Sequence, residues 1–198
     1  VTLRDLGDLS ELGAYCGLEH VVWPLALRYG IHRYRLVGGP ARELVRIVCA
    51  VLPGGEELFR RVAPYYLTAA NNAVLGFAPG HPFLRYMLER IEALPKSQRT
   101  RRYRLGTHLL QECLAARGAE LGVHQLSPAH FYPLGPELSR QYFRARRDAR
   151  SAAEHVVSPE THVINWYASV SDLAAYDEAR VRAESERTMF AHLMSRAL

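Results

Sequence analysis

The spacing of hydrophobic positions along the chain predicts several amphipathic helices. The clearest covers residues 38–52, where Pro40 lies near the first turn, as helices prefer, and a Pro-Gly-Gly sequence ends the run. Its predicted apolar face consists of Leu44, Val45, Val48, Cys49 and Leu52. A second helix is predicted over residues 82–94, between Pro82 and Pro95, with an apolar face of Phe83, Met87, Ile91 and Leu94.

Shorter periodic stretches predict further helical segments. Leucines recur at every third position within residues 1–15, and residues 56–63 have the pattern of another helical turn. A helix is expected from about Thr107, closed by Gly118. Ser171 is expected to cap a final helix with a solvated, highly charged middle. The end of that helix offers docking side chains at Met189, Phe190, Leu193 and Met194.

Three stretches predict β-strands. Residues 67–78 form an apolar run that predicts a buried strand, and residues 122–127 predict a short strand before a proline-rich loop. Residues 161–170 are rich in β-branched and aromatic side chains, which is typical of strands. Alternating strands and helices indicate an α/β fold with a mixed sheet flanked by helices. Because so few strands are predicted, we expect the sheet to be incomplete within this chain.

Composition fits one ordinary folded domain. The chain has 198 residues, of which 48% are hydrophobic and 23% charged, and no apolar run approaches the about 18 residues of a membrane span. The N-terminal residues carry charges where a signal peptide needs an apolar core, so we expect no secretion signal. Cys16, Cys49 and Cys113 lack metal-ligand or redox spacing, and we expect buried free thiols in a reducing cytosol.

The net charge of +5 comes from arginine, since Lys96 is the only lysine. Guanidinium groups match phosphate oxygens, but a GC-rich genome also enriches arginine. The basic runs Arg99 to Arg104 and Arg140 to Arg150 contain aromatic side chains, a composition that suits nucleic acid or an anionic membrane surface. A solvated helix face is the commoner outcome for such runs, so both interpretations stay open.

Familiar catalytic motifs are missing from the sequence. It contains no phosphate-binding P-loop, no GxGxxG fingerprint and no HExxH zinc motif. Two adjacent amides, Asn71 and Asn72, open the apolar strand instead. An amide supplies a donor and an acceptor together, which suits the hydroxyl groups of an uncharged sugar. The alternative is that such an amide satisfies backbone groups in a turn. We expect the turn role for Asn71 and an N-terminal capping or packing role for His81.

Five stretches in order carry a family resemblance: "VTLRDLGDL", "NNAVLGFAPGHPFLRYMLERI", "LGTHLLQECL", "LSPAHFYPL" and "THVINWYAS". Together they resemble glycosyltransferases with a DXD sugar-binding motif, specifically the α-1,4-glycosyltransferase relatives. The resemblance covers about residues 1–12 and 68–170. It implies a GT-A-like fold, a nucleotide-sugar donor, a glycan or glycolipid acceptor and a bound Mn or Mg ion, which would neutralise the diphosphate leaving group.

The resemblance also implies site residues. Asn72 matches the Asn that precedes Ala in the family strand, and Gly106, Thr107 and His108 occupy the place of a Gly-Pro helix start, with Thr107 in place of Pro. These four are the expected substrate-binding residues. His162 matches a late His near the donor diphosphate or metal. The family Trp should follow two positions later, where this sequence has Ile164; Trp166 lies further on and is expected to be a core aromatic.

The DXD motif of the family would stand just before residue 1. Asp5 and Asp8 lie three apart in a helix-like segment and do not match it, so we expect the metal ligands to be absent from this chain. Residues 1–170 are thus expected to be the C-terminal part of a GT-A-like domain, without its nucleotide-binding part and with an atypical insertion over about 16–65. Residues 171–198 are expected to be a C-terminal helix.

We expect such a chain to have little transfer activity alone. Its catalytic residues are unknown, and its expected location is the cytoplasm, with peripheral contact to the inner face of the membrane through the Arg-rich segments. The alternative is a non-catalytic basic module that binds nucleic acid or an anionic membrane surface. We rank it lower, and nucleic acid is not the partner we expect, because arginine bias has a compositional explanation whereas the ordered motifs do not.

Overall fold

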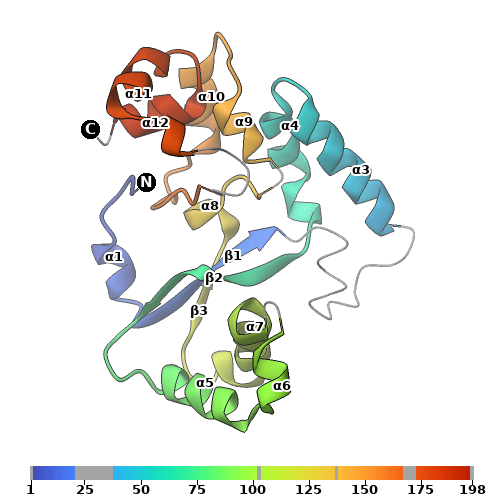
Figure 1. The fold of residues 1–198 in the computed structure, drawn as a ribbon, viewed down its shortest axis with the longest axis vertical. Helices are drawn as coiled ribbons and strands as arrows, with labels where there is room; N and C mark the ends of the chain where they lie inside the picture. The colour runs from blue at the N-terminus through green and yellow to red at the C-terminus, as the bar shows by residue number, and fades with distance from the viewer. Residues whose placement is uncertain (1, 21–37, 102–103, 137, 167–172, 197–198) are drawn as a thin grey trace.

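The computed structural model describes residues 2–20, 38–101, 104–136, 138–166 and 173–196, with only the backbone for 38–42 (Figure 1). Its sheet has three strands, β1 (Ala14–His20), β2 (Thr68–Phe77) and β3 (His124–Leu126), in the order β2-β1-β3. Strand β1 pairs antiparallel with β2 and parallel with β3. The fold is therefore α/β with a mixed sheet and is mostly helical, and both β2 and β3 occur where strands are predicted.

The central strand, β1, is one that the sequence pattern did not predict. Its first residues alternate, with Ala14, Cys16 and Leu18 on one face and Tyr15 on the other. Gly17 also lies on the second face, where a Cβ atom would come within 2.6 Å of the Phe131 ring. The glycine therefore allows α8 (Pro128–Phe131) to pack directly against the strand backbone.

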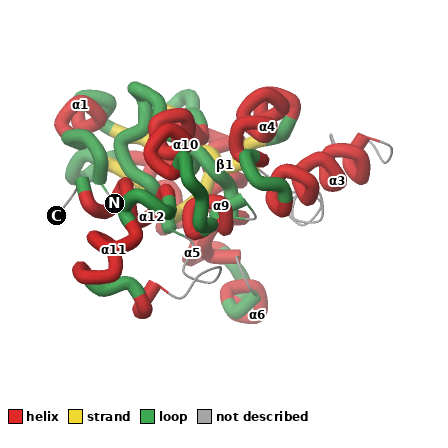
Figure 2. Tube along the Cα trace, turned by 90° about the horizontal axis from the view of Figure 1, so that it is seen from above, coloured by secondary structure: helices red, strands yellow, loops and turns green. Residues whose placement is uncertain are grey.

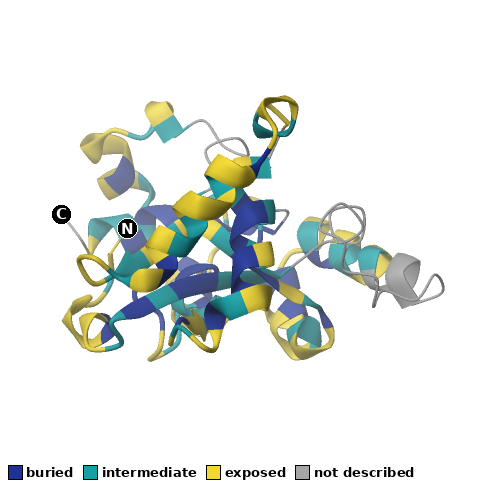
Figure 3. Ribbon diagram, turned by 90° about the horizontal axis from the view of Figure 1, so that it is seen from below, coloured by how far each residue is buried: buried dark blue, intermediate teal, exposed yellow. Residues whose placement is uncertain are grey.

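Two layers of side chains cover the two faces of the sheet. Helices α5 (Pro82–Ala93) and α7 (Leu109–Cys113) lie on one face, and α8 lies on the other (Figure 1). The apolar face predicted for α5 is confirmed, since Phe83 and Leu94 are buried and Met87 and Ile91 pack with them. The short helix α1 (Gly7–Ser10) adds Leu9 to the α8 side. Buried positions gather along the strands and the inward sides of the helices (Figure 3).

Strand β2 contains a bulge at the two asparagines. Asn71 pairs with Gly17, but the next pair is Leu75 with Cys16, so residues 72–74 have no partner in β1. The side-chain oxygen of Asn71 accepts a hydrogen bond from the backbone N–H of Ala73 at 2.8 Å, which holds the bulge in shape. Asn71 therefore satisfies a backbone group as predicted, but it does so in a strand bulge and not in a turn. The predicted burial of this strand is wrong in its middle, because β2 is an edge strand and residues 72 and 73 are exposed.

A larger helical layer lies above the α8 side of the sheet in Figure 1. It consists of α3 (Gly38–Val51), α4 (Gly55–Val62), α9 (Arg140–Phe143), α10 (Ala149–Val156), α11 (Glu178–Glu184) and α12 (Met189–Ser195). Its core includes Phe59, Tyr142, Ile164 and Phe190. A 3-10 turn, Ala63–Tyr65, connects α4 toward β2.

Helix α3 forms as predicted, but its predicted apolar face is wrong. Cys49 is fully buried, whereas Leu44 is 64% exposed and Leu52 is 46% exposed. The helix projects from the body of the protein, and little of it is covered by other described elements (Figure 2). Gly54, with a φ of 74°, separates it from α4 as the Pro-Gly-Gly sequence predicts.

The C-terminal region departs from the predicted single helix. A 3-10 turn, Leu173–Ala175, precedes α11, which Asp177 caps, and α12 is a separate helix capped by Thr188. Ser171, the predicted cap, lies outside the described residues. The predicted docking of the chain end is confirmed: Met189, Phe190 and Leu193 are buried and Met194 packs against them.

Residues 161–166 do not form the predicted strand. Within the described ranges, their β-pairing is limited to a single bridge between Val163 and Thr2. The backbone N–H groups of His162 and Val163 instead bond the carbonyl of His130, at 3.0 and 3.2 Å. The rest of the predicted strand, residues 167–170, lies outside the described residues.

The remaining helical segments begin or end at other residues than predicted. Lys96–Arg99 forms a short helix, α6, at the start of the basic run, where no helix was predicted. A helical run continues from α7 through Leu114–Gly118, but Gly118 does not close it, and the left-handed glycine is Gly122 with a φ of 69°. The three cysteines are buried free thiols, as predicted. No helix in the described part of the chain has the length and apolarity to cross a membrane.

Candidate functional site

Three of the predicted substrate-binding residues meet at the bulge of β2. The Thr107 hydroxyl donates a hydrogen bond to the side-chain oxygen of Asn72 at 3.1 Å, across 35 positions of sequence. Gly106 lies against the same amide, because a Cβ atom added there would be 3.1 Å from Asn72 Nδ2. The bulge therefore directs Asn72 toward the start of the α7 helical run.

The chain bends sharply at Gly106. The segment Arg104–His108 is helical except at this residue, which has φ −101° and ψ −114°. The bend brings the backbone against the Asn72 amide, at a distance where a methyl group would crowd it. The helical run that leads into α7 then begins after the bend, near the predicted start at Thr107. The Thr107 hydroxyl bonds Asn72, so it points toward β2.

The two bonded residues differ in their access to solvent. Thr107 is only 6% exposed, whereas Asn72 lies on the exposed part of the strand. Because the Asn72 oxygen accepts from Thr107, its Nδ2 group remains as a donor, and it lies next to Gly106. No described residue accepts a hydrogen bond from that nitrogen. The arrangement therefore presents a held amide with two N–H donors at the protein surface.

His108 follows directly, and its environment favours the neutral imidazole. Burial lowers the pKa of His108, the nearby Arg104 lowers it further, and Glu112 raises it. Arg104 and Glu112 form an ion pair with each other. A neutral His108 ring adds no positive charge next to Thr107.

His162 lies in a different setting from the other predicted residues. Its ring stacks parallel to the ring of His130, with centroids 5.8 Å apart and an interplanar angle of 3°. Its Nδ1 is 2.8 Å from the Glu160 carbonyl oxygen, and its own carbonyl accepts the backbone N–H of Leu3 at 2.8 Å. The side chain is 9% exposed. His162 thus joins the N-terminal segment to α8, on the sheet face opposite α7.

Two secondary expectations around the family motifs are confirmed. Trp166 is a core aromatic that packs edge-on against Tyr142 and Phe190, with centroids 4.8 and 4.9 Å apart. His81 caps α5, because its Nδ1 accepts the backbone N–H of Phe83 at 3.3 Å.

The described residues do not fit a divalent cation. Nowhere in the described ranges do three His, Cys, Asp or Glu side chains gather closely enough to hold a metal ion. The Asp5 carboxylate accepts the backbone N–H of Gly7 at 2.9 Å, which is a local turn contact. No metal-dependent step is therefore assigned to these side chains.

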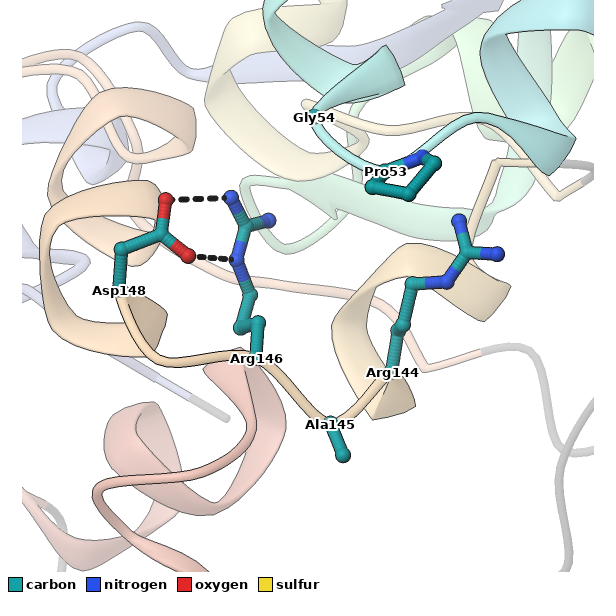
Figure 4. Close-up of a pocket in the computed structure, with 6 residues that line it drawn as sticks. All are labelled: Pro53, Gly54, Arg144, Ala145, Arg146 and Asp148. Carbon is teal, nitrogen blue, oxygen red and sulfur yellow. Dashed lines mark hydrogen bonds and ion pairs between the residues drawn. The ribbon is translucent and has the colours of Figure 1, made fainter.

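Two cavities occur away from the predicted residues. One of about 350 Å³ lies between α1, β1 and β2, and is lined by Leu9, Ser10, Gly13, Tyr15, Gly76, Phe77, Ala78 and Pro79. The other, of about 300 Å³, lies between the turn after α3 and the segment after α9, with Arg144 and Arg146 among its lining residues (Figure 4). Sequence reasoning treated these arginines only as part of a basic run. The two arginines are two positions apart in an extended segment. This spacing could have identified them as neighbours on one side of the backbone.

Comparison with known proteins adds no assignment to this geometry. Neither protein-family models, nor curated proteins, nor solved structures gave a match to the chain.

Proposed function

We propose that the chain contributes a sugar-binding surface to a glycosyltransferase with a GT-A-like fold, which transfers a sugar from a nucleotide-sugar donor to a polysaccharide or glycolipid acceptor. The observation that carries this proposal is the meeting of Asn72, Gly106 and Thr107. The sequence resemblance selects these residues from separate motifs, and the Thr107 hydroxyl lies 3.1 Å from the Asn72 oxygen.

The chemistry of the surface suits a sugar. Thr107 fixes the orientation of the Asn72 amide, so the N–H donors of this exposed residue are held in place for a hydroxyl oxygen. Gly106 keeps a side chain away from the amide, and the neutral state favoured for His108 adds no charge that would select an ionic ligand. Uncharged donors that are held in place select a ligand rich in hydroxyl groups.

The structure bears on the alternative of a basic binding module. Many described arginines pair with carboxylates on the same protein. Each pair neutralises positive charge that would otherwise attract an external anion. Such pairs are Arg61–Glu57, Arg104–Glu112, Arg117–Glu120, Arg146–Glu56, Arg150–Glu154, Arg180–Glu184 and Arg182–Glu178. Arg99 donates to the carbonyls of Leu94 and Glu92 instead. We therefore prefer the sugar-binding surface.

The proposal is tested by binding measurements. The variants distinguish the hydrogen bond of the Thr107 hydroxyl from the packing of the Thr107 side chain. The chain is titrated with a panel of nucleotide sugars by calorimetry and by NMR. A neutral hydrogen bond contributes about 0.5–1.5 kcal/mol, so Asn72→Ala should weaken binding by about 2- to 10-fold. Thr107→Val, which releases the amide, should have a similar effect.

Thr107→Ser is the matched control, because it keeps the hydroxyl that orients Asn72. It should bind as the original chain does. Equal losses in the Ser and Val variants would show that packing at residue 107, and not the hydroxyl, matters. If no nucleotide sugar binds the original chain, the proposed surface is wrong.

A further inference from the structure

We propose that the cavity between the Pro53–Gly54 turn and the Arg144–Asp148 segment binds a phosphate group, carried by a soluble phosphate compound or by a lipid headgroup. It has a volume of about 300 Å³. At about 30 Å³ for each water molecule, it holds about ten waters. That space exceeds what a phosphate group needs, so the cavity also admits part of the molecule that carries the phosphate.

The backbone after α9 places two arginines on one side of the cavity. Arg144 is extended, with φ −72° and ψ 129°, and side chains alternate sides along extended backbone. Arg144 and Arg146 therefore point toward the Pro53–Gly54 turn, while Ala145 points away, as Figure 4 shows. The turn closes the opposite wall of the cavity.

Arg144 supplies the unsatisfied charge. Its Nη1 atom is buried, and no hydrogen-bond acceptor reaches it among the residues that the structure describes. A buried charged donor without an acceptor is costly, and the planar guanidinium matches phosphate oxygens with two parallel hydrogen bonds. An anion in the cavity would meet this donor.

The start of α4 contributes backbone rather than charge to the cavity. Gly54 is the residue before the helix, has a left-handed φ of 74°, and has no side chain. The Gly55 N–H already donates to the Leu52 carbonyl at 3.1 Å, and Glu56 and Glu57 place two carboxylates in the first turn of α4. Because Gly54 lines the cavity, a ligand can approach the backbone there, and Arg144 is the group that attracts an anion.

Arg146 is already neutralised by two acids. It bonds the Asp148 carboxylate through Nε at 2.7 Å and Nη2 at 2.9 Å, and it also pairs with Glu56. Glu56 is buried, but the Asp148 side chain is 63% exposed. The hydrogen bond from Arg146 lowers the pKa of Asp148, which keeps it charged at neutral pH. Asp148 therefore repels an incoming phosphate and occupies donors that the phosphate could use.

These contacts predict opposite effects for two substitutions. Arg144→Gln removes the free guanidinium and should weaken phosphate binding at least tenfold, which corresponds to about 1.4 kcal/mol. Asp148→Asn removes the competing charge and should tighten binding severalfold. The matched control is Arg147→Gln, an equal loss of charge on an exposed side chain that does not line the cavity. It should change affinity by less than about twofold, as expected for screened surface charge.

The experiment measures binding of inorganic phosphate and pyrophosphate by calorimetry, with circular dichroism as a check on folding. Co-sedimentation with phosphatidylcholine vesicles, with and without phosphatidic acid, distinguishes the lipid source. Binding to any of these probes that follows the predicted variant order supports the site, and the probe identifies the source. Absence of binding to all of them, or equal losses for Arg144→Gln and Arg147→Gln, would overturn it. This cavity shares no residue with the Asn72 surface, so either proposal can fail alone.

Discussion

The substitution Gln141→Ala should release the end of α3 without unfolding the protein. The Gln141 side chain is 1% exposed. Its Nε2 lies 2.8 Å from the Cys49 carbonyl oxygen, 3.0 Å from that of Ala50 and 2.8 Å from that of Leu52. These are carbonyl groups at the C-terminal end of α3, which have no partner within the helix. Among the described residues, this amide and the buried Cys49 hold the C-terminal end of α3.

The magnitude follows from the number of hydrogens. An amide nitrogen has two, so Gln141 bonds at most two of the three carbonyls at once. The Leu52 carbonyl also accepts the Gly55 N–H at 3.1 Å. At about 0.5–1.5 kcal/mol for each hydrogen bond, the loss is about 1–3 kcal/mol. A central value of about 2 kcal/mol corresponds to about a 30-fold change in the equilibrium for local opening, because about 1.36 kcal/mol is a factor of ten.

Native-state hydrogen exchange measures this opening directly. The amides of residues 47–52 should exchange about 30-fold faster in Gln141→Ala, while the amides of β1 and α5 change little. The melting temperature should fall by about 2–4 °C for each kcal/mol by which the substitution lowers the free energy of global unfolding. Gln125→Ala is the control, because Gln125 is an exposed residue of β3.

Two results would refute this reasoning. Unchanged exchange in α3 would mean that the Gln141 hydrogen bonds contribute nothing to holding the helix. A uniform increase throughout the protein would mean that α3 opens only with the whole fold.

Three further predictions concern packing, pH and capping. Gly17→Ala places a methyl group 2.6 and 2.7 Å from two buried rings, so it should destabilise by about 1–3 kcal/mol in urea denaturation. Gly7→Ala, whose nearest neighbour is a side chain at 3.4 Å, should change stability little, and equal effects would contradict the packing argument. Burial lowers the pKa of His20 from 6.5 to about 4, so the unfolded chain binds a proton that the folded chain excludes. Stability should therefore fall as pH drops from 6.5 toward 4, by up to about 3 kcal/mol. His20→Phe should flatten that dependence, and an unchanged pH profile would exclude His20 as its source. His81→Ala should cost about 1 kcal/mol by thermal denaturation through loss of the α5 cap, and His81→Asp should retain it.

Several features of the site were accessible from sequence because they depend on local chemistry. The period of Phe83, Met87, Ile91 and Leu94 determined the buried face of α5, and the Pro after His81 marked its start. The Asn71 side chain bonds a backbone group only two residues away. Such contacts depend on neighbours along the chain, so the residue types alone predict them.

Strand pairing could not be predicted from the sequence in this way. Strand β1 pairs with partners in β2 and β3 that lie far away along the chain, the nearest pair being His20 with Thr68, and its side-chain alternation extends over only a few residues. Residues 161–166 have the composition of a strand, but their backbone N–H groups bond the end of α8. Helix α3 has an amphipathic pattern, yet the described residues leave Leu44 exposed. In each case the partner, and not the propensity, determines the outcome.

By itself, the sequence determined where most of the described helices lie, and it selected the residues that we propose for a sugar-binding surface. The tertiary structure decided which of them meet. The bulge in β2 turns Asn72 toward Thr107, and Gly106 leaves room for the amide, whereas His162 is held against His130 on the other side of the sheet. The physical reason is that these contacts join segments distant in sequence, and only the packing of helices on the two faces of the sheet brings those segments together.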